Sequence, residues 1–459
     1  MNLTRTIETI FRKYLPSPFT IAVLLTLFTI LMVLLFTDAK PDEVHLITVL
    51  KYWESGIWNN GLLVFAYQMM LILVLGHILV LSEPMSKLIH KLVCLVNNSG
   101  NAVLLVSIST MIVSFFNWGL GLIFGAIIAR KVAEYAKMHA IAINYPLIGA
   151  SGYVGLMVWH GGISGSAPLK VAEKGHLAQL MQGLVLPAGI QEKIPEFIST
   201  GQTIFSSANL IIFAVMLIVV PFVLYQINKT VLPTKIELDT FQLVKNKKLT
   251  PQSAEKLDHS YLLGIIFGCL LLLACFFQYK GMLRNLTITP NFLNIFMLGC
   301  ALILHKNITN FLKALDEAIK GTSGILIQFP LYFGIMGIMS GSGMIGKLSA
   351  FFVSISTEIT LPIFTFFSAG LVNIFVPSGG GQWAVQGPVV VESALKLGVP
   401  LPKAIMALAY GDQLTNMLQP FWALPLLGIT KLKAKEILPY TLIVMVVGMA
   451  VYITGLLVM

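Results

Sequence analysis

One long apolar stretch of this chain contains several polar residues together with a proline and glycines that would break a helix. Residues 373–388 read NIFVPSGGGQWAVQGP and lie inside Ile359–Val391, a run that contains no Asp, Glu, Lys, Arg or His. As one straight helix this run would be about 50 Å long, against roughly 30 Å for the hydrocarbon core of a bilayer. Pro377 followed by three glycines cannot hold a regular helix. Broken backbone in a bilayer must be buried in protein or line a cavity, which predicts a binding site; the alternative is a kinked packing helix.

Three other apolar runs are interrupted in the same way. They contain FFNWGLG at 115–121, HGGISGS at 160–166 and GDQLTNMLQP at 411–420. His160 and Asp412 are the ionisable residues near two of these interruptions, and ionisable groups inside a membrane are usually functional. Asp412 could carry a proton or bind a cation, and His160 could donate to a substrate or titrate. The alternative for both is a local helix cap.

The composition indicates a polytopic membrane protein. Hydrophobic residues make up 56% of the chain and charged residues 11%, which is far from a soluble domain. The net charge of +10 is not gathered into a basic patch interleaved with aromatics, so no nucleic-acid partner is expected. The cysteines lie in or beside apolar segments without a CxxC spacing, as small buried hydrophobes do; they are Cys94, Cys269, Cys275 and Cys300.

Apolar segments recur along the whole chain. The first, Phe19–Phe36, follows basic residues but has no small-residue cleavage site, so we expect a retained span. His77 lies in an unbroken segment and is expected to pack rather than react. The eleven segments are Phe19–Phe36, Gly61–Ser82, Ala102–Ala129, Pro146–Leu169, Thr203–Asn228, Ser260–Tyr279, Asn285–Leu304, Gly321–Gly346, Ile359–Val391, Ala404–Thr430, which contains Asp412, and Ile437–Met459.

The distribution of Lys and Arg in the loops favours two re-entrant hairpins. If all segments crossed the membrane from a cytoplasmic N-terminus, the outside loops would hold slightly more Lys and Arg than the inside loops, against the positive-inside rule. If 102–129 instead enters and leaves on the cytoplasmic side, and 359–391 on the outer side, the inside loops hold about twice as many. The alternative is that the loops are too few for this count to be significant.

The two predicted hairpins also mark an internal repeat. Asn117 falls on Asn373 at an offset of 256 residues, and the same offset pairs Pro146 with Pro402, Gly155 with Gly411 and Ala167 with Ala423. Each hairpin is followed by an interrupted span and then by an unbroken one. Because one hairpin enters from each side, the halves would have inverted topology, and the substrate site of such transporters lies near the midplane.

This pattern predicts an all-α polytopic membrane protein with an inverted-topology repeat, two re-entrant hairpins and two broken transmembrane helices. We expect scaffold spans in 1–101, the first repeat in 102–228, a cytoplasmic linker in 229–259, further scaffold spans in 260–358 and the second repeat in 359–459. The repeats comprise a hairpin at 102–129 or 359–391, a broken helix at 146–169 or 404–430, and a span at 203–228 or 437–459. Residues 312–320 should form an amphipathic helix on the inner surface.

The sequence resembles one family of bacterial membrane proteins. NIFVPSGGGQWAVQGP and GDQLTNMLQPFWALPLL, with FFNWGLGLIFGA and WHGGISGSAPL in the first half, are similar to the short-chain fatty acid transporters of the AtoE type. The resemblance covers nearly the whole chain. It implies a secondary transporter rather than an enzyme, within a superfamily of dimers that have two re-entrant hairpins and an elevator-like motion. It also implies a small monocarboxylate substrate such as acetoacetate or butyrate.

No Lys or Arg lies inside a predicted span, so a bound carboxylate should use neutral donors rather than flanking Arg130, Lys170 or Lys403. A half-helix that begins after Pro377 would aim free N–H groups at the anion. A short acyl tail would lie against Trp118, Trp383 or Phe421. The expected substrate-binding residues are Ser378, Gly379, Gly380, Gly381, Gln382, Trp383, Asn117, Trp118, Gly119, His160, Ser164 and Asn416, with Gly121 and Ser166 as further contributors.

A cation should accompany the substrate if the substrate is accumulated. Moving one negative charge into an inside-negative cell costs about 2.3 kcal/mol per 100 mV. The oxygen-bearing residues Asn117, Asn373, Asp412, Thr415 and Asn416 would suit sodium, whereas His160 or Asp412 would suit a proton. The sequence does not choose between the two ions, and it predicts no other metal or cofactor.

Other functional classes fit less well. An intramembrane metalloenzyme would need clustered ligands, and the sequence has no HExxH. A channel would need a continuous polar pore. A symporter for another small organic anion, such as a dicarboxylate, is the main alternative, but the shortage of cationic groups favours one carboxylate over two. We expect a homodimer in the inner membrane, with the N-terminus in the cytoplasm and the C-terminus outside.

Overall fold

A computed structural model describes residues 3–39, 43–181, 191–236, 238, 255–284 and 289–459. Over these residues the chain is helical and contains no strand. Much of the predicted linker, residues 237 and 239–254, lies outside the described part. The recurring apolar segments of the sequence therefore form a bundle of helices. Within each helix the backbone groups bond to one another, as a bilayer requires.

Seven helices of the described chain are long and apolar enough to cross a membrane. Together with the transporter-like sequence they support a multi-pass membrane protein, as the composition predicts. Six of these helices are unbroken predicted spans. They are α2 (Pro18–Phe36), α4 (Asn60–Leu81), α11 (Ser207–Asn228), α13 (Tyr261–Arg284), α16 (Ser323–Gly341) and α22 (Ala434–Val458).

The seventh, α6, is one arm of a helix pair. The predicted segment 102–129 is divided into α6 (Ser99–Phe116) and α7 (Trp118–Met138), which pack on each other. The predicted segment 359–391 is divided into α18 (Leu361–Phe375) and α19 (Gly379–Leu397). Both divisions fall where the sequence predicts them, at Asn117 and at the turn before the three glycines.

The two interrupted spans follow these helix pairs. The first contains α8 (Tyr145–Ser151), the 3-10 turn η1 (Val154–Met157), an irregular loop at 158–165 and α9 (Ser166–Lys170). The second contains α20 (Leu401–Thr415), the 3-10 turn η5 (Asn416–Leu418) and α21 (Pro420–Thr430). In each half, therefore, a helix pair is followed by an interrupted span.

The other described helices include two that the sequence predicts, an amphipathic helix and a span. The sequence does not predict the rest, because they are short or carry charges. The predicted amphipathic helix at 312–320 is α15 (Ile308–Ala318), followed by the 3-10 turn η4 (Ile319–Gly321). The remaining helices are α14 (Pro290–His305), which is a predicted span, and α1 (Leu3–Tyr14), α3 (His45–Ile57), α5 (Glu83–Val93), α10 (His176–Leu180), α12 (Glu255–Asp258) and α17 (Met344–Ser354), with 3-10 turns at 191–193 and 200–202.

Glycines allow the helices around the breaks to approach closely. A Cβ on Gly125 of α7 would lie 2.0 Å from the carbonyl oxygen of Gly152, and a Cβ on Gly411 of α20 would lie 2.0 Å from that of Phe366. Any side chain at either position would push backbone away from backbone. Each interrupted span is therefore packed directly against the helix pair of its own half.

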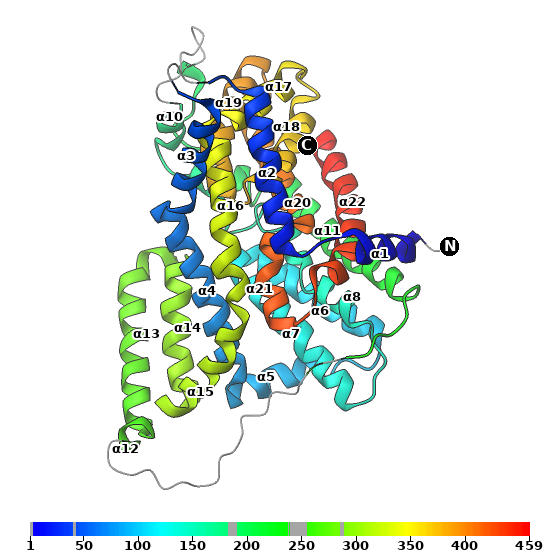
Figure 1. Cartoon of the computed structure of the whole chain (residues 1–459), viewed down its shortest axis with the longest axis vertical. Helices are drawn as coiled ribbons and strands as arrows, with labels where there is room; N and C mark the ends of the chain where they lie inside the picture. Colours follow the sequence, from blue (N-terminus) through cyan, green and yellow to red (C-terminus); the bar gives the residue numbers. More distant parts are fainter. Residues whose placement is uncertain (1–2, 40–42, 182–190, 237, 239–254, 285–288) are drawn as a thin grey trace.

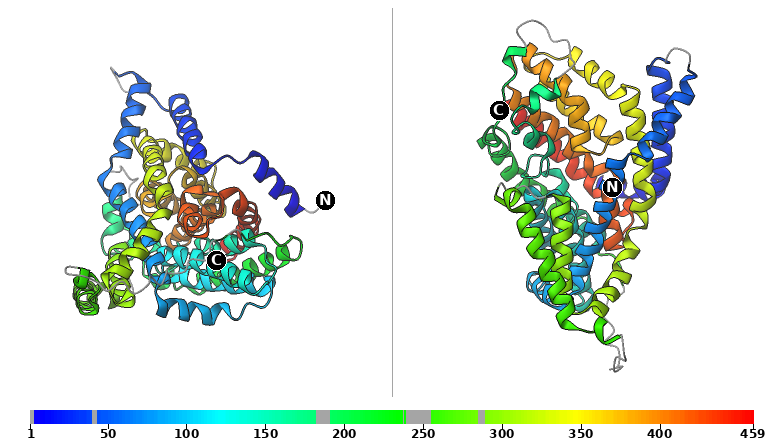
Figure 2. Two further views of the ribbon diagram at one scale, coloured as in Figure 1. Left: turned by 60° about the horizontal axis from the view of Figure 1, so that its bottom comes forward. Right: turned by 90° about the vertical axis from the view of Figure 1, so that its left-hand side faces the viewer.

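The two helix pairs lie toward opposite ends of the molecule. Figure 1 shows α6 and α7 in the lower half, with α18 and α19 in the upper half. The two interrupted spans lie between them, since η1 contacts both α20 and η5. The views in Figure 2 show the same separation, and α13 and α14 stand at the side of the bundle. The breaks of both halves thus come together inside the protein.

Candidate functional site

The turn between α18 and α19 exposes the start of a helix. Ser378 is the N-cap of α19, and its Oγ accepts from the N–H of Gly381 at 3.2 Å. Within the described chain no acceptor is found for the N–H groups of Gly379 and Gly380. Free N–H groups at a helix start attract an anion, because the positive end of the helix dipole lies there.

The start of α19 packs against the loop of the first interrupted span. A Cβ on Gly379 would lie 2.8 Å from Cε1 of His160 and 2.8 Å from the ring of Trp159. Gly380 is exposed, and a Cβ there would find its nearest atom, Oγ of Ser166, at 3.9 Å. Thus Gly379 forms the contact between the two halves, and Gly380 faces open space next to it.

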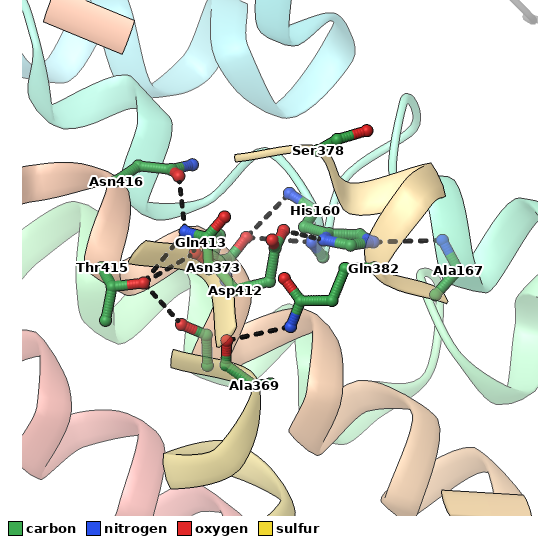
Figure 3. A network of polar contacts seen from close by, with 12 residues as sticks. His160, Ala167, Ala369, Asn373, Ser378, Gln382, Asp412, Gln413, Thr415 and Asn416 are labelled. Carbon is green, nitrogen blue, oxygen red and sulfur yellow. Dashed lines mark hydrogen bonds and ion pairs between the residues drawn. The ribbon is translucent and has the colours of Figure 1, made fainter. Parts of the chain in front are cut away.

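His160 connects the two interrupted spans. Its ring is fully buried and stacks on Trp159, with centroids 4.6 Å apart. Nε2 accepts from the N–H of Ala167 at 3.0 Å, so the ring proton is on Nδ1, which donates to Oδ2 of Asp412 (Figure 3). With Asp412 ionised, the pair holds one proton and a net charge of −1 in a buried place, where an uncompensated charge is costly.

Gln413 reinforces the connection between the spans. Its Oε1 accepts from the N–H groups of His160, at 2.7 Å, and Gly161, at 3.0 Å, and its Nε2 donates to the hydroxyl of Tyr452 at 2.8 Å. Two backbone donors freed by the first break are thus satisfied by a side chain from the second half. Sequence reasoning missed this role, although the residue stands beside Asp412 in the GDQLTN motif.

Asn373 holds the second break together. Its Nδ2 donates to the carbonyl oxygen of Asp412 at 2.6 Å, to Oγ1 of Thr415 at 2.9 Å and to Oδ1 of Asn416 at 2.8 Å. Gln419 donates in turn to the carbonyl oxygen of Asn373. The coupling-ion candidates of the second half are therefore neighbours, as Figure 3 shows.

Several oxygens around this break have no donor. Buried side-chain oxygens without a partner among the described residues include Oδ1 of Asp412, Oδ1 of Asn373, Oε1 of Gln382 and Oε1 of Gln419. Gln382 uses its Nε2 to bind the carbonyl oxygen of Ala369 at 2.9 Å, which turns its amide toward α18. Unpartnered buried acceptors are rare in proteins, and a proton, a cation or water would satisfy them.

The candidates of the first half form the tip of the α6–α7 pair. Asn117 caps α7 by accepting from the N–H of Leu120 at 2.9 Å, and Oγ of Ser164 accepts from the N–H of Trp118 at 3.0 Å. A Cβ on Gly121 would meet Ser114 at 1.9 Å, so this glycine lets the two helices pack closely. For Gly119 the nearest contact would be Oδ1 of Asn117, at 3.6 Å.

An aromatic cluster lies beside this tip. The ring centroid of Trp118 is 5.0 Å from that of Trp422 and 6.0 Å from that of Trp159. Phe65 contacts both Trp118 and Trp422 at 6.2 Å, and Phe421 stacks on Phe329 at 3.9 Å. Since Trp159 also stacks on His160, the polar centre has an apolar wall on one side. The contributions of Trp159 and Trp422 were not predicted from the sequence.

Trp383 lies apart from this cluster. Its Nε1 donates to Nε2 of His176 on α10 at 3.0 Å, and it packs in a separate apolar core. Burial lowers the pKa of His176 below its ordinary value, and nearby Lys170 lowers it further. His176 is therefore neutral at pH 7 and can accept this bond. The structure thus groups Trp118 and Phe421 together and Trp383 elsewhere.

The flanking cations have partners away from the polar centre. Arg130 donates to Glu134 at 2.9 Å and to the carbonyl oxygen of Ile429 at 2.8 Å. Lys170 pairs with Glu173 at 3.0 Å, and Lys403 donates to the carbonyl oxygen of Met459 at 3.0 Å. Among the described residues, neutral N–H and hydroxyl groups are left as the donors around His160.

Substitution of Asp412 tests the buried pair. In Asp412→Asn the amide oxygen can still accept from Nδ1 of His160 while the net charge disappears, so the purified protein should keep or raise its melting temperature. In Asp412→Leu that donor is left unsatisfied, at a cost of about 1–3 kcal/mol. Differential scanning fluorimetry should therefore rank the Leu variant below the Asn variant; equal melting temperatures would contradict the pairing.

Two solved transporters resemble the fold over nearly their whole length. MtrF of Neisseria gonorrhoeae, described as illuminating a class of antimetabolite efflux pumps, matches with a TM-score of 0.40 and 14% identity over 98% of this chain and 97% of its own. YdaH of Alcanivorax borkumensis, described as having an unusual topology, matches with a TM-score of 0.41 and 14% identity over 96% and 98%.

Two relatives are similar in sequence from end to end. One, from Escherichia coli K12, is 36% identical over 97% of this chain and 96% of its own length. The other, from Haemophilus influenzae, is 36% identical over 99% of each chain. Both are provisionally named short-chain fatty acid transporters. The profile of the family described as "Short chain fatty acid transporter" matches residues 1–459, and this chain belongs to that family.

Proposed function

We propose that the protein imports short-chain fatty acids, small monocarboxylates such as acetoacetate or butyrate, by secondary active transport. Family membership supports the substrate class. The single structural observation that carries the proposal is the meeting of two interrupted spans at the His160–Asp412 pair. This pair lies beside a helix start whose first N–H groups have no acceptor among the described residues. Substrate sites of inverted-repeat transporters are formed in this way, from discontinuous helices near the middle of the membrane.

The proposed substrate lies between the start of α19 and the loop at 158–165. Its carboxylate would accept from the N–H groups of Gly379 and Gly380, and Ser166, near Gly380, adds a hydroxyl donor. Its short apolar tail would lie against Trp159 and the cluster around Trp118. An apolar wall with a few convergent polar groups is typical of small-ligand sites.

The charge of the region favours one carboxylate over two. Arg130, Lys170 and Lys403 have partners elsewhere, and the region contains the buried negative charge of Asp412. A second carboxylate would meet no compensating cation among the described residues, and desolvating it would be costly. A dicarboxylate or another small organic anion is therefore the alternative rather than the leading proposal.

Coupling to a cation follows from the same buried charge. An anionic substrate would bring a second negative charge near Asp412, whose Oδ1 lacks a donor. A proton on this pair, or a sodium ion bound by the unpartnered oxygens of Asn373 and its neighbours, would remove the repulsion. The cation would also offset the cost of about 2.3 kcal/mol per 100 mV for moving the anion into a negative cell.

The arrangement of the two halves supports an elevator-type mechanism with alternating access. The helix pairs α6–α7 and α18–α19 lie toward opposite ends of the molecule, as two hairpins that enter from opposite faces would (Figure 1). We propose that they are re-entrant and that the halves form an inverted repeat. We further propose a homodimer in the inner membrane, with a cytoplasmic N-terminus and an outside C-terminus, as the loop charges favour.

Uptake by purified protein in proteoliposomes tests the substrate and the coupling. We expect saturable uptake of labelled butyrate or acetoacetate and little uptake of succinate, with stimulation by an imposed sodium or proton gradient, because the buried charge needs a cation. Asp412→Asn should lose the response to the gradient. A preference for succinate would overturn the substrate class, and indifference to both gradients would overturn the coupling.

Gly379 and Gly380 form a matched pair for testing the start of α19. Gly379→Ala should lower uptake roughly tenfold, because overpacking against His160 and Trp159 at 2.8 Å costs about 1–3 kcal/mol. Gly380→Ala, with its nearest atom at 3.9 Å, should leave folding unchanged. The substitution should change only the KM for uptake, because Gly380 lies at the proposed position of the substrate carboxylate. An unchanged rate in Gly379→Ala would contradict the site.

Thiol labelling tests the re-entrant pairs. In a protein whose native cysteines are replaced, exposed positions are Leu95, in the turn before α6, and Met138, the last residue of α7. Leu95→Cys and Met138→Cys should both react from the cytoplasmic side. Ile359→Cys and Lys396→Cys should react from the outer side. An impermeant maleimide applied to right-side-out and inverted vesicles makes the measurement. Opposite labelling within either pair would mean that the pair crosses the membrane.

A further inference from the structure

A basic cavity lies away from the proposed transport site. Its volume is about 440 Å³, and it opens where the turn between α21 and α22 meets α8 and the segment after α11. Lys235, Lys431 and Lys433 line it, together with Tyr145 and Thr430. This volume is within the range of small-ligand sites, which is about 300–1,000 Å³. The function described so far makes no use of it.

Among the described residues that line this cavity, Glu436 is the acidic one, and it stands against three lysines. Glu436 is occupied at the start of α22, where its carboxylate accepts from the backbone N–H of Lys433 at 2.7 Å. Among the described residues, no carboxylate lies within ion-pair distance of the Lys431 or Lys433 side chain. Burial lowers the pKa of Lys431, and the charge of Arg130 lowers it further; the charge of Glu317 raises it, and Lys320 has a smaller lowering effect.

Two hydrogen bonds fix the backbone just before Lys431, at the start of the turn that carries these lysines. Arg130 donates to the carbonyl oxygen of Ile429 at 2.8 Å, and the hydroxyl of Tyr145 donates to that of Thr430 at 2.7 Å. The backbone of Lys431 is left-handed, with φ of +60°, a conformation that residues other than glycine rarely adopt. A lysine thus occupies a position at which glycine would be less strained.

An apolar cavity adjoins the basic one. Its volume is about 370 Å³, and it lies between the segment that joins α1 to α2 and the start of α22. Leu15, Pro18 and Leu427 line it, and it shares Leu432 and Lys433 with the basic cavity. In Figure 1, α1 crosses beside α22 close to this place. A charged cavity and an apolar cavity with common walls would fit an amphiphile.

We propose that these two cavities bind one anionic phospholipid, with its phosphodiester at Lys431 and Lys433 and an acyl chain along Leu15, Leu427 and Leu432. Basic pockets at the cytoplasmic ends of transmembrane helices bind anionic lipid headgroups. The loops that form this pocket are among those that the Lys and Arg distribution assigns to the cytoplasm. The amphipathic helix α1, with exposed Lys13, lies next to it, as an interfacial helix would.

The bound lipid connects three parts of the chain. It fills the space between the α1–α2 segment and the turn that leads from α21 into α22, and its phosphate neutralises the surplus charge of that turn. Because it binds the folded protein only, it stabilises the fold by mass action. The proposal does not depend on which substrate is transported, since the two sites share no residue.

Lipid titration of the purified full-length protein in detergent tests the proposal. Dioctanoyl phosphatidylglycerol should raise the melting temperature and appear as one bound molecule in native mass spectrometry, whereas dioctanoyl phosphatidylcholine should not. The double variant Lys431→Gln/Lys433→Gln should bind phosphatidylglycerol roughly 30-fold more weakly, since each lysine near a membrane surface contributes about fivefold. Lys87→Gln/Lys91→Gln, which removes the same charge from α5, should bind as the unmodified protein does.

Three outcomes would overturn the proposal. Equal affinity of the two double variants would exclude the cavity, equal affinity for phosphatidylcholine would exclude recognition of charge, and binding of glycerol 3-phosphate as tight as that of the lipid would indicate a soluble phosphate ligand. Should the lysine variant fail to fold, crosslinking of the unmodified protein with a photoactivatable phosphatidylglycerol tests where the lipid binds. Crosslinks should fall in residues 15–18 or 427–436, and crosslinks confined to other segments would exclude the site.

Discussion

Every backbone N–H and C=O group that a broken helix releases inside a membrane must find a partner in the protein or line an aqueous cavity. Here the two broken spans satisfy each other. The Gln413 side chain accepts from two N–H groups of the first break, and the His160 ring bonds both Asp412 of the second span and Ala167 beyond the first break. The two breaks are therefore joined by hydrogen bonds between the spans, and these bonds form the polar centre of the protein.

The sequence predicts most of the architecture, since charge-free runs and Gly/Pro clusters are direct consequences of a bilayer. The division of 359–391 before Gly379 and the interruption at 416–419, just before Pro420, fall where these signals stand. Helices such as α3 escaped prediction because they are short and carry charges, so neither length nor composition separates them from loops. Their position is decided by packing, for example by Gly56 against α16.

Candidate residues for the site could be named from the sequence, but the contacts between them could not. His160, Asp412 and Asn373 are recognisable as polar residues at breaks, whereas the contact of His160 with Asp412 joins residues far apart in the chain. Periodicity carries no information about such contacts. Trp159 and Trp422 read as ordinary apolar residues of their segments, and only the fold brings them around Trp118. Trp383, beside the glycines in sequence, turns instead toward α10.

The hydrogen bond from Ala167 fixes which ring nitrogen of His160 can take up a proton. Nε2 already accepts a backbone N–H at the beginning of α9, so a second ring proton would displace that N–H and free the first turn of α9. Charging the imidazole is thus inseparable from moving the chain beside the start of α19. A change of charge at this histidine would therefore be accompanied by displacement of the peptide that lies beside the start of α19.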